Sequence, residues 1–205
     1  GSFDLIDNDT VALTNLNRQI IATLDTVGQP KVEVMAKRIA SINPDANVNC
    51  RQCFFLPANQ HEFDFSQYDY VVDAVDTVAA KIAIVLAAKA AGVPVISSMG
   101  AGNKVNPAMF EVADIYKTKV DPLARVMRQA MKKNNIKKLK VVYSQELPLL
   151  PINEEIESEC HAETSKRRAL PGSNAFTPSV AGLIIASEVI KDLVGLDDSH
   201  RKGLA

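Results

Sequence analysis

The sequence predicts an α/β domain built on a doubly wound, mostly parallel sheet. Short apolar runs that read as buried strands alternate with longer segments whose apolar residues follow helical spacing. The first run, residues 3–6, ends in Asp7, which is typical of a parallel strand whose carboxyl end opens into a ligand site. A length of 205 residues fits one such domain.

The other elements follow from local patterns. Strands are expected at short apolar or alternating runs, namely residues 46–53, 68–74, 93–98 and 110–115. Helices are expected where caps or prolines precede apolar residues at helical spacing, starting near residues 31, 77, 122 and 177. The spacing assigns a buried stripe to the third helix (Leu123, Val126, Met127, Ala130, Met131) and to the fourth (Val180, Leu183, Ile184, Ile190, Leu193). Gly195 is expected to end the fourth helix.

The chain is expected to form a single domain over residues 1–205. Residues 151–175 are rich in glutamate and poor in apolar residues, which favours a mobile crossover loop, and residues 196–205 read as a frayed tail. A mononucleotide-binding unit normally begins with a strand and a Gly-rich loop before its acidic second strand. Because the acidic strand comes first here, either the sequence is a fragment or a separate chain supplies the first strand and loop, and we expect a fragment.

Composition excludes several classes of protein. The 23 basic and 24 acidic residues balance, and the apolar runs are interrupted by charges before they reach the roughly 20 residues of a membrane helix. Three cysteines cannot all pair within one chain, and no signal peptide is evident. These features favour a protein of the cytoplasm that does not span a membrane.

A nucleotide site is predicted around the first strand and the helix that follows it. Asp7 is placed to accept hydrogen bonds from a ribose, although for Asp7 taken alone a plain Asx turn is the simpler explanation. Lys31 falls in the first turn of a helix, where the helix dipole disfavours a cation unless an anion lies between them. A bound phosphate would supply that anion, and Arg18 offers a second phosphate ligand.

The strand at 68–74 delivers two more acids, Asp73 and Asp76, to the same sheet edge as Asp7. Clustered carboxylates repel one another without a cation, and Mg²⁺ on a nucleotide favours one or two carboxylates plus phosphate oxygens. We assign Asp76 to this metal role and interpret Asp73 as a helix-entry residue only.

Three stretches together resemble the ubiquitin-activating-enzyme superfamily, which includes the adenylating enzymes of thiamine and molybdopterin biosynthesis: residues 5–11 (LIDNDTV), 14–19 (TNLNRQ) and 27–31 (VGQPK). Residues 73–77 (DAVDT) match a further motif of that superfamily. The resemblance covers nearly the whole chain and implies a Rossmann-like fold that binds ATP.

By this resemblance, Asp7 binds the ribose of ATP, while Asn15, Arg18 and Lys31 hold the triphosphate. Asp76 serves Mg²⁺ and the α-phosphate. Arg18, Lys31 and Asp76 are therefore the predicted catalytic residues, and Asp76 is the predicted metal ligand.

A basic segment over residues 117–140 carries nine of the 23 basic residues against one acid, Asp121. A solvated helix face usually mixes charges of both signs, so this segment favours a polyanionic partner such as nucleic acid. The predicted nucleic-acid contacts are Lys117, Lys119, Arg125, Arg128, Lys132, Lys133, Lys137 and Lys138.

The same part of the chain resembles one branch of the superfamily, the bacterial tRNA threonylcarbamoyladenosine dehydratases, through residues 100–102, 106–107, 112–114, 117–118, 121–124 and 142–146. This resemblance implies ATP-dependent cyclisation of a modified adenosine in tRNA by way of an acyl-adenylate. It also implies a homodimer and a possible sulfur-transfer partner. Two alternatives stay open: an activator of a ubiquitin-like sulfur-carrier protein, and a non-catalytic ATP-binding scaffold.

Cys160 separates the dehydratase interpretation from the activator. It lies in the crossover where thioester-forming relatives place a nucleophile, but between Glu157, Glu159 and Glu163, whose charges disfavour a thiolate. We expect Cys160→Ser to retain AMP formation from ATP. A thioester trapped on Cys160 during turnover would instead support the activator.

Overall fold

The computed structural model describes residues 1–150 and 172–196. Within them, a two-stranded parallel sheet pairs β1 (Ser2–Ile6) with β2 (Asn47–Arg51). A second sheet has the order β3-β4-β6-β5, formed by β3 (Val71–Asp73), β4 (Val95–Ser98), β6 (Lys140–Ser144) and β5 (Phe110–Asp114). In this sheet β3, β4 and β6 are parallel and β5 is antiparallel. The expected mostly parallel α/β fold is confirmed.

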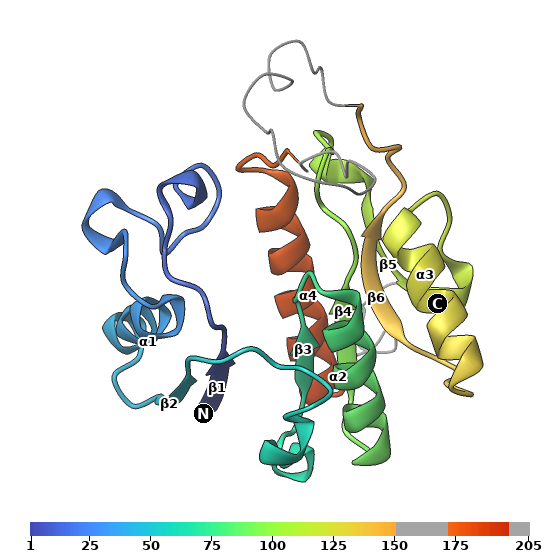
Figure 1. Cartoon of the computed structure of the whole chain (residues 1–205), viewed down its shortest axis with the longest axis horizontal. Coiled ribbons are helices and arrows are strands. Elements are labelled where there is room, and N and C mark those ends of the chain that lie inside the picture. The colour runs from blue at the N-terminus through green and yellow to red at the C-terminus, as the bar shows by residue number, and fades with distance from the viewer. Residues whose placement is uncertain (151–171, 197–205) are drawn as a thin grey trace, which may run out of the picture.

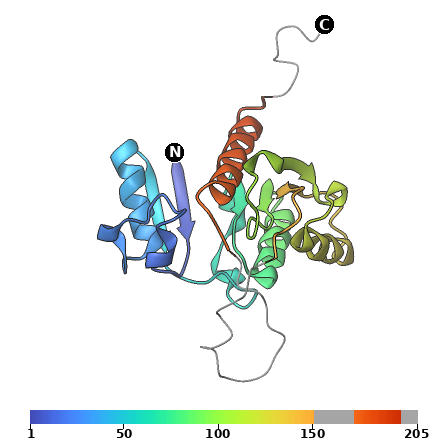
Figure 2. The ribbon, with the colours of Figure 1, turned by 90° about the horizontal axis from the view of Figure 1, so that it is seen from above.

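Helices cover both faces of the larger sheet. On one face lie α2 (Val78–Ala90) and α3 (Pro122–Lys133), which contact each other, and on the other lies α4 (Thr177–Leu193) (Figures 1 and 2). Successive side chains of a strand point to opposite faces. Accordingly, Val141 and Tyr143 of β6 join the core beneath α2 and α3, whereas Val142 joins Ala181 and Ile185 of α4.

The smaller sheet forms an N-terminal unit with α1 (Lys31–Ile42), which contacts both of its strands. β1 pairs only with β2, and β3 only with β4, among the described residues, so no strand joins the two sheets (Figure 1).

Four hydrogen bonds connect the N-terminal unit to the rest of the described residues, and one of them runs from Arg51 Nη1 to the carbonyl of Glu62 at 3.2 Å. Tyr68 Oη donates to Asp4 Oδ2 at 2.7 Å. Asn17 Nδ2 donates to the carbonyl of Ser173 at 2.9 Å, and Ser179 Oγ donates to the carbonyl of Arg18 at 3.5 Å. Ile6 also packs against the larger core.

The helix ends follow the expected capping chemistry. Gly28, at φ +86°, precedes α1, and Gly195, at φ +65°, follows α4. Asp121 caps α3 by accepting a hydrogen bond from the backbone N–H of Ala124 at 2.8 Å. The expected strands and helices are all present, while β6 was not predicted.

The predicted buried stripes were only partly correct. Val126 of α3 is 45% exposed, and Leu183, Ile190 and Leu193 of α4 are 71%, 60% and 51% exposed. α4 instead buries the stripe that contains Ala181 and Ile185. Because α4 is apolar on more than one face, helical spacing alone did not identify the face that packs on the sheet.

Two predicted segments lie mostly outside the described residues: the crossover at 151–175, apart from 172–175, and the tail at 196–205, apart from Leu196. Cys160 therefore also lies outside the described residues. Among the described residues, no helix is long and apolar enough to cross a membrane.

The loop before α3 holds a strained residue that gives a test of the fold. Val120 has φ +62° and is 49% exposed. The left-handed conformation costs a residue with a Cβ about 1–2 kcal/mol, and Asn tolerates it better than a β-branched residue does. Val120→Asn is therefore expected to raise the free energy of unfolding by about 1 kcal/mol and the melting temperature by roughly 2–4 °C.

The matched control is Val105→Asn, at a residue that is 56% exposed and has no positive φ. Equal melting temperatures for the two variants would contradict the assignment of strain to Val120.

Candidate functional site

The candidate site lies at the carboxyl ends of β1 and β3, where parallel α/β sheets bind ligands. Both strands run in the same direction, so the segments that follow them lie toward the same side of the molecule (Figure 1). Asp7 follows β1 directly and is half-buried, whereas Asp76 lies three residues beyond β3 and is exposed. Within the described residues, no hydrogen bond or ion pair joins Asp76 to the four predicted nucleotide ligands of the N-terminal unit.

Asp7 forms a turn of its own. Its Oδ1 accepts a hydrogen bond from the backbone N–H of Asp9 at 2.8 Å, which is an Asx turn. The turn fixes the carboxylate at the end of β1 and leaves Oδ2 without a partner among the described residues. Both interpretations of Asp7 therefore fit the geometry, because the turn holds a carboxylate that can still accept hydrogen bonds from a ribose.

Lys31 starts α1 and already has an anionic partner. Its Nζ lies 2.8 Å from Asp9 Oδ2, and its backbone N–H donates to the carbonyl of Asp9 at 3.0 Å. The Lys31 side chain is 13% exposed, and that of Asp9 is 55% exposed. Asp9 therefore supplies the anion that was expected beside Lys31 at this helix start. The sequence patterns did not identify Asp9 as the partner of Lys31. A phosphate that binds Lys31 would compete with this carboxylate.

Asn15 and Arg18 lie in the loop that precedes α1. Asn15 is 8% exposed, and its Oδ1 accepts a hydrogen bond from the backbone N–H of Ala12 at 3.0 Å, so its side chain shapes the loop. Arg18 Nη1 donates to the carbonyl of Thr14 and to Asn17 Oδ1, both at 2.9 Å. These contacts use only part of the guanidinium, whose remaining N–H groups could bind a phosphate.

Next to Arg18, Gln19 has an unusual environment. Its Oε1 is the buried side-chain polar atom that has no hydrogen-bond partner in the described part of the chain. Buried acceptors are normally satisfied, so this oxygen marks a place where a water or ligand donor fits. The loop from Asn15 to Gln19 therefore combines a cation with an open acceptor.

Asp73 is more than a helix-entry residue, which corrects the prediction. It is fully buried and forms an ion pair with Lys81 Nζ at 3.1 Å; both side chains are 0% exposed. Burial lowers the pKa of Lys81, while the charges of Asp73 and Asp76 act in the opposite direction. The sequence does carry a signal of this pair, because a single lysine within an otherwise apolar helix indicates a buried partner.

A second buried ion pair lies at the same edge of the sheet. Lys104 Nζ contacts Asp121 Oδ2 at 2.7 Å and donates to the carbonyl of Gly100 at 2.8 Å. The carbonyl of Lys104 in turn accepts a hydrogen bond from Asn174 Nδ2 at 2.8 Å. Lys104 therefore joins three parts of the structure: the loop after β4, the start of α3 and the segment before α4.

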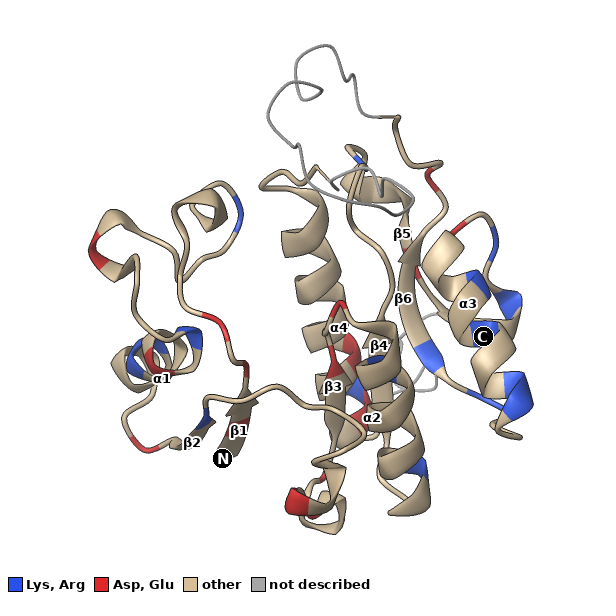
Figure 3. Ribbon diagram, in the orientation of Figure 1, with Lys and Arg blue, Asp and Glu red and all other residues tan. Residues whose placement is uncertain are grey.

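The basic segment lies mainly along α3 and the turns at its two ends (Figure 3). Seven of its predicted nucleic-acid contacts are exposed: Lys117, Lys119, Arg125, Lys132, Lys133, Lys137 and Lys138. Arg128 is half-buried, and its Nη1 donates to the carbonyl of Thr118 at 2.6 Å and to Thr118 Oγ1 at 2.8 Å. Lys140 is paired with Glu188 at 3.2 Å and with Asp192 at 2.7 Å.

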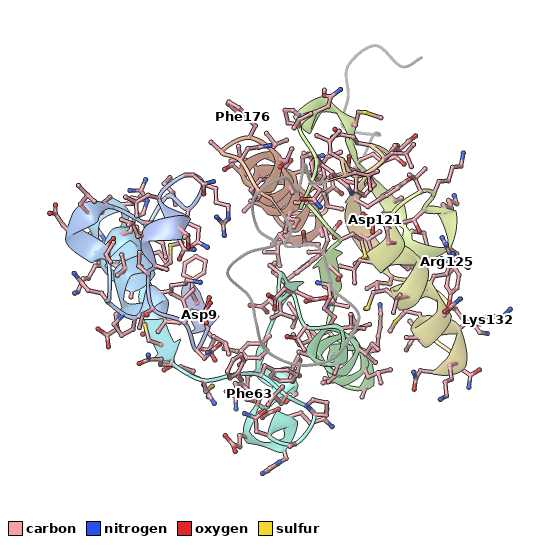
Figure 4. All side chains as sticks on the ribbon, turned by 45° about the horizontal axis from the view of Figure 1, so that its top comes forward. Asp9, Phe63, Asp121, Arg125, Lys132 and Phe176 are labelled. Carbon is pink, nitrogen blue, oxygen red and sulfur yellow. The ribbon has the colours of Figure 1, made fainter. Side chains whose placement is uncertain are left out.

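This basic surface does not adjoin the N-terminal unit. Figure 4 shows Asp9 on one side of the molecule and Arg125 and Lys132 on the other. Asp121 caps the amino end of α3 and, through Lys104, is tied to the loop after β4. The amino end of α3 therefore lies toward the edge that carries the candidate site, and Lys132 lies farther along the helix.

The described residues contain no group of three or more His, Cys, Asp or Glu side chains that could hold a metal by themselves. Asp76 has an exposed carboxylate whose one hydrogen bond comes from Thr77 Oγ1 at 3.3 Å. One free carboxylate suits Mg²⁺ that is bound largely through phosphate oxygens and water.

A carboxylate after β1, a cation at the start of α1 and a carboxylate after β3 form an arrangement that is typical of α/β nucleotide-binding proteins. The family model described as "ThiF family" matches residues 1–204, and the chain belongs to the ThiF family.

Named relatives agree with this assignment. The chain is 44% identical over 198 residues to the tRNA threonylcarbamoyladenosine dehydratase of Bacillus subtilis (strain 168), which covers 95% of this chain and 78% of that protein. It is 41% identical over 132 residues to the protein of the same name from Escherichia coli (strain K12), covering 64% of this chain and 49% of that protein.

Solved structures of E. coli tRNA N6-threonylcarbamoyladenosine dehydratase, TcdA, share the fold. The complex with AMP has a TM-score of 0.81 at 30% identity and covers 95% of this chain and 76% of that one. The complex with ATP has a TM-score of 0.81 at 31% identity and covers 99% and 79%.

The predicted roles of Lys31 and Asp76 can be tested by replacing each residue in the full-length protein. Lys31→Ala and Asp76→Asn are expected to lose AMP formation from ATP with little change in stability. An ion pair at the surface, such as that of Lys31 with the 55% exposed Asp9, contributes about 0–1 kcal/mol, and an exposed carboxylate contributes little to folding. AMP release and melting temperature should be measured on the same samples.

Lys37→Ala provides a control, because Lys37 is an exposed cation on the same helix. If both test variants melt early, or if both turn over like the parent and Lys37→Ala, the site is misassigned.

Proposed function

We propose that this protein is an ATP-dependent tRNA threonylcarbamoyladenosine dehydratase. The observation that carries the proposal is the 44% identity over 95% of the chain to the B. subtilis protein of that name. The similarity to TcdA structures that hold AMP and ATP supports adenylation as the first step.

In the proposed reaction, a carboxylate oxygen of the threonyl group attacks the α-phosphorus of ATP. The bond to pyrophosphate breaks, and an acyl-adenylate forms. The carbamoyl group of the same nucleoside then attacks the activated carbonyl and expels AMP, which closes a ring. The substrate loses the elements of water, while ATP becomes AMP and pyrophosphate.

The residues of this chain would mainly position groups and stabilise charge, as adenylation requires. Asp7 would accept hydrogen bonds from the ribose. Asn15 would shape the loop that presents Arg18, and Arg18 would bind the triphosphate together with Lys31. Lys31 would exchange its Asp9 partner for a phosphate at the start of α1, where the helix dipole favours an anion.

Mg²⁺ is part of this proposal, and Asp76 is the residue that would hold it. The donor set fits, since Asp76 offers one exposed carboxylate and the remaining ligands would be phosphate oxygens and water. When bound, Mg²⁺ would neutralise charge on the phosphates.

The exposed cations along and beside α3 would bind tRNA. Their position across the molecule from Asp9 suits a large substrate, whose backbone can contact α3 while one nucleoside reaches the site (Figure 4). On the family resemblance we also propose a homodimer, contact with a sulfur-transfer protein, and a location in the cytoplasm.

The test of the function is AMP formation by the full-length protein with and without tRNA that carries threonylcarbamoyladenosine. We expect AMP to form only with the modified tRNA, together with one cyclised nucleoside for each AMP. AMP formation that requires a ubiquitin-like protein would identify an activator, and ATP binding without turnover would identify a scaffold.

The basic surface gives a separate prediction. Charge reversal of Lys132, Lys133, Lys137 and Lys138 is expected to weaken tRNA binding and leave ATP affinity unchanged. Each lost phosphate contact should reduce the slope of log affinity against log salt by nearly one on a duplex and by somewhat less on a single strand. Both quantities can be measured by titrations at several salt concentrations.

Charge reversal of Lys37, Arg38 and Lys89, which are exposed cations on α1 and α2, is the control. If the control changes the salt slope as much per charge as the α3 variant does, the effect is due to net charge and the α3 surface is not the binding site.

A further inference from the structure

The turn between β3 and α2 is held from both sides by a buried ion pair. Asp73 Oδ1 accepts hydrogen bonds from Lys81 Nζ at 3.1 Å and from the backbone N–H of Val75 at 3.3 Å. Lys81 Nζ also donates to the carbonyl of Val75 at 2.9 Å. That carbonyl belongs to the peptide bond that leads into Asp76, so the pair fixes the backbone on which the Asp76 carboxylate is mounted.

The pair is itself anchored to the sheet. Asp73 Oδ2 accepts a hydrogen bond from Ser97 Oγ, and Ser97 is the register partner of Asp73 on β4. Lys81 is fixed by α2, where its backbone N–H donates to the carbonyl of Thr77 at 3.0 Å. The ammonium group of Lys81 therefore connects β3, the turn and α2. Asp76 lies in this turn, between β3 and α2.

Folding stability alone does not account for this arrangement. Removing two charges from water costs several kcal/mol per ion in general, and replacing a buried ion pair by apolar residues of similar volume is often neutral or stabilising. This region offers apolar surroundings, since Ala80, Ala83 and Ile84 of α2 are all buried. An apolar pair would pack there, but it could not bind both the N–H and the carbonyl of Val75.

We infer that Lys81 is a positioning residue for Asp76: held by Asp73, it fixes the Val75–Asp76 peptide and so orients the Asp76 carboxylate toward Mg²⁺ and the α-phosphate. The inference rests on the proposed function, in which Asp76 holds the metal. Lys81 is fully buried and does not itself contact the nucleotide.

The test uses the double variant Asp73→Asn/Lys81→Met in the full-length protein, which avoids leaving one buried charge without a partner. It is compared with Asp76→Asn and with the combination of all three changes. Lys140→Met is the matched control. It also removes an ion-paired lysine, but at the amino end of β6, in the sheet to which Asp73 belongs.

We expect the double variant to lower kcat for AMP formation about 10- to 100-fold, as for a small misplacement of a reacting group, and to raise the Mg²⁺ concentration needed for half-maximal rate. KM for ATP should change little, because the ribose and triphosphate ligands lie in the N-terminal unit. In the Asp76→Asn background the same two changes should cause little further loss, since residues that act through one group are not additive.

A readout without nucleotide completes the test. Amide hydrogen exchange across residues 74–77 should be faster in the double variant and unchanged in Lys140→Met. If the double variant does not fold, Ser97→Ala replaces it: that change removes the anchor of Asp73 but keeps both charges, and the same shifts are expected on a smaller scale.

Three results would overturn the inference: losses that add fully to those of Asp76→Asn, a kcat equal to that of the parent, or unchanged exchange across residues 74–77. In each of these cases Asp76→Asn would still lose activity by itself, and the proposed function would stand. Parent-like activity in Asp76→Asn would instead reject the metal role of Asp76, and the positioning role of Lys81 with it.

Discussion

The structure depends on one constraint: β4 and β6 are buried on both faces. Val95 and Ile96, neighbours on β4, enter different cores, and Val141 and Val142 of β6 do the same. A strand pair buried in this way requires helices on both sides, which α2 and α3 provide on one face and α4 on the other. The candidate site lies instead at the edge of this packed core, beyond the carboxyl ends of β1 and β3.

At those strand ends the protein uses lysines to hold loops in place. Lys81 binds the carbonyl of Val75 after β3, and Lys104 binds the carbonyl of Gly100 after β4. Each lysine is fully or almost fully buried and paired with an aspartate, so each loop is tied to the core by a charge-assisted hydrogen bond. Buried charge pairs therefore organise the carboxyl edge, whereas apolar packing organises the interior of the larger sheet.

Local chemistry was largely predictable from the sequence, and long-range partners were not. Gly28 and Pro30 correctly marked the start of α1, and Asp121 the start of α3, because caps and positive φ angles are properties of a few adjacent residues. Helical spacing did not reveal which face of α4 meets the sheet, since Leu183 and Ile185 are both apolar and only tertiary packing distinguishes them. The sequence identified the acids at the strand ends but not the partners of Lys31 and Asp73. Those partners depend on which residues the fold brings into contact, and local sequence patterns do not show this.

The division into two sheets has a consequence for dynamics. A two-stranded sheet is marginally stable by itself, and the N-terminal unit is joined to the remainder by a few contacts, including those of Asp4 with Tyr68 and of Asn17 with Ser173. Such a unit opens at a lower free energy than the doubly covered core, and its amides exchange with solvent first. A nucleotide that contacted both Lys31 and Asp76 would link the two units. Its binding energy would then suppress this local opening.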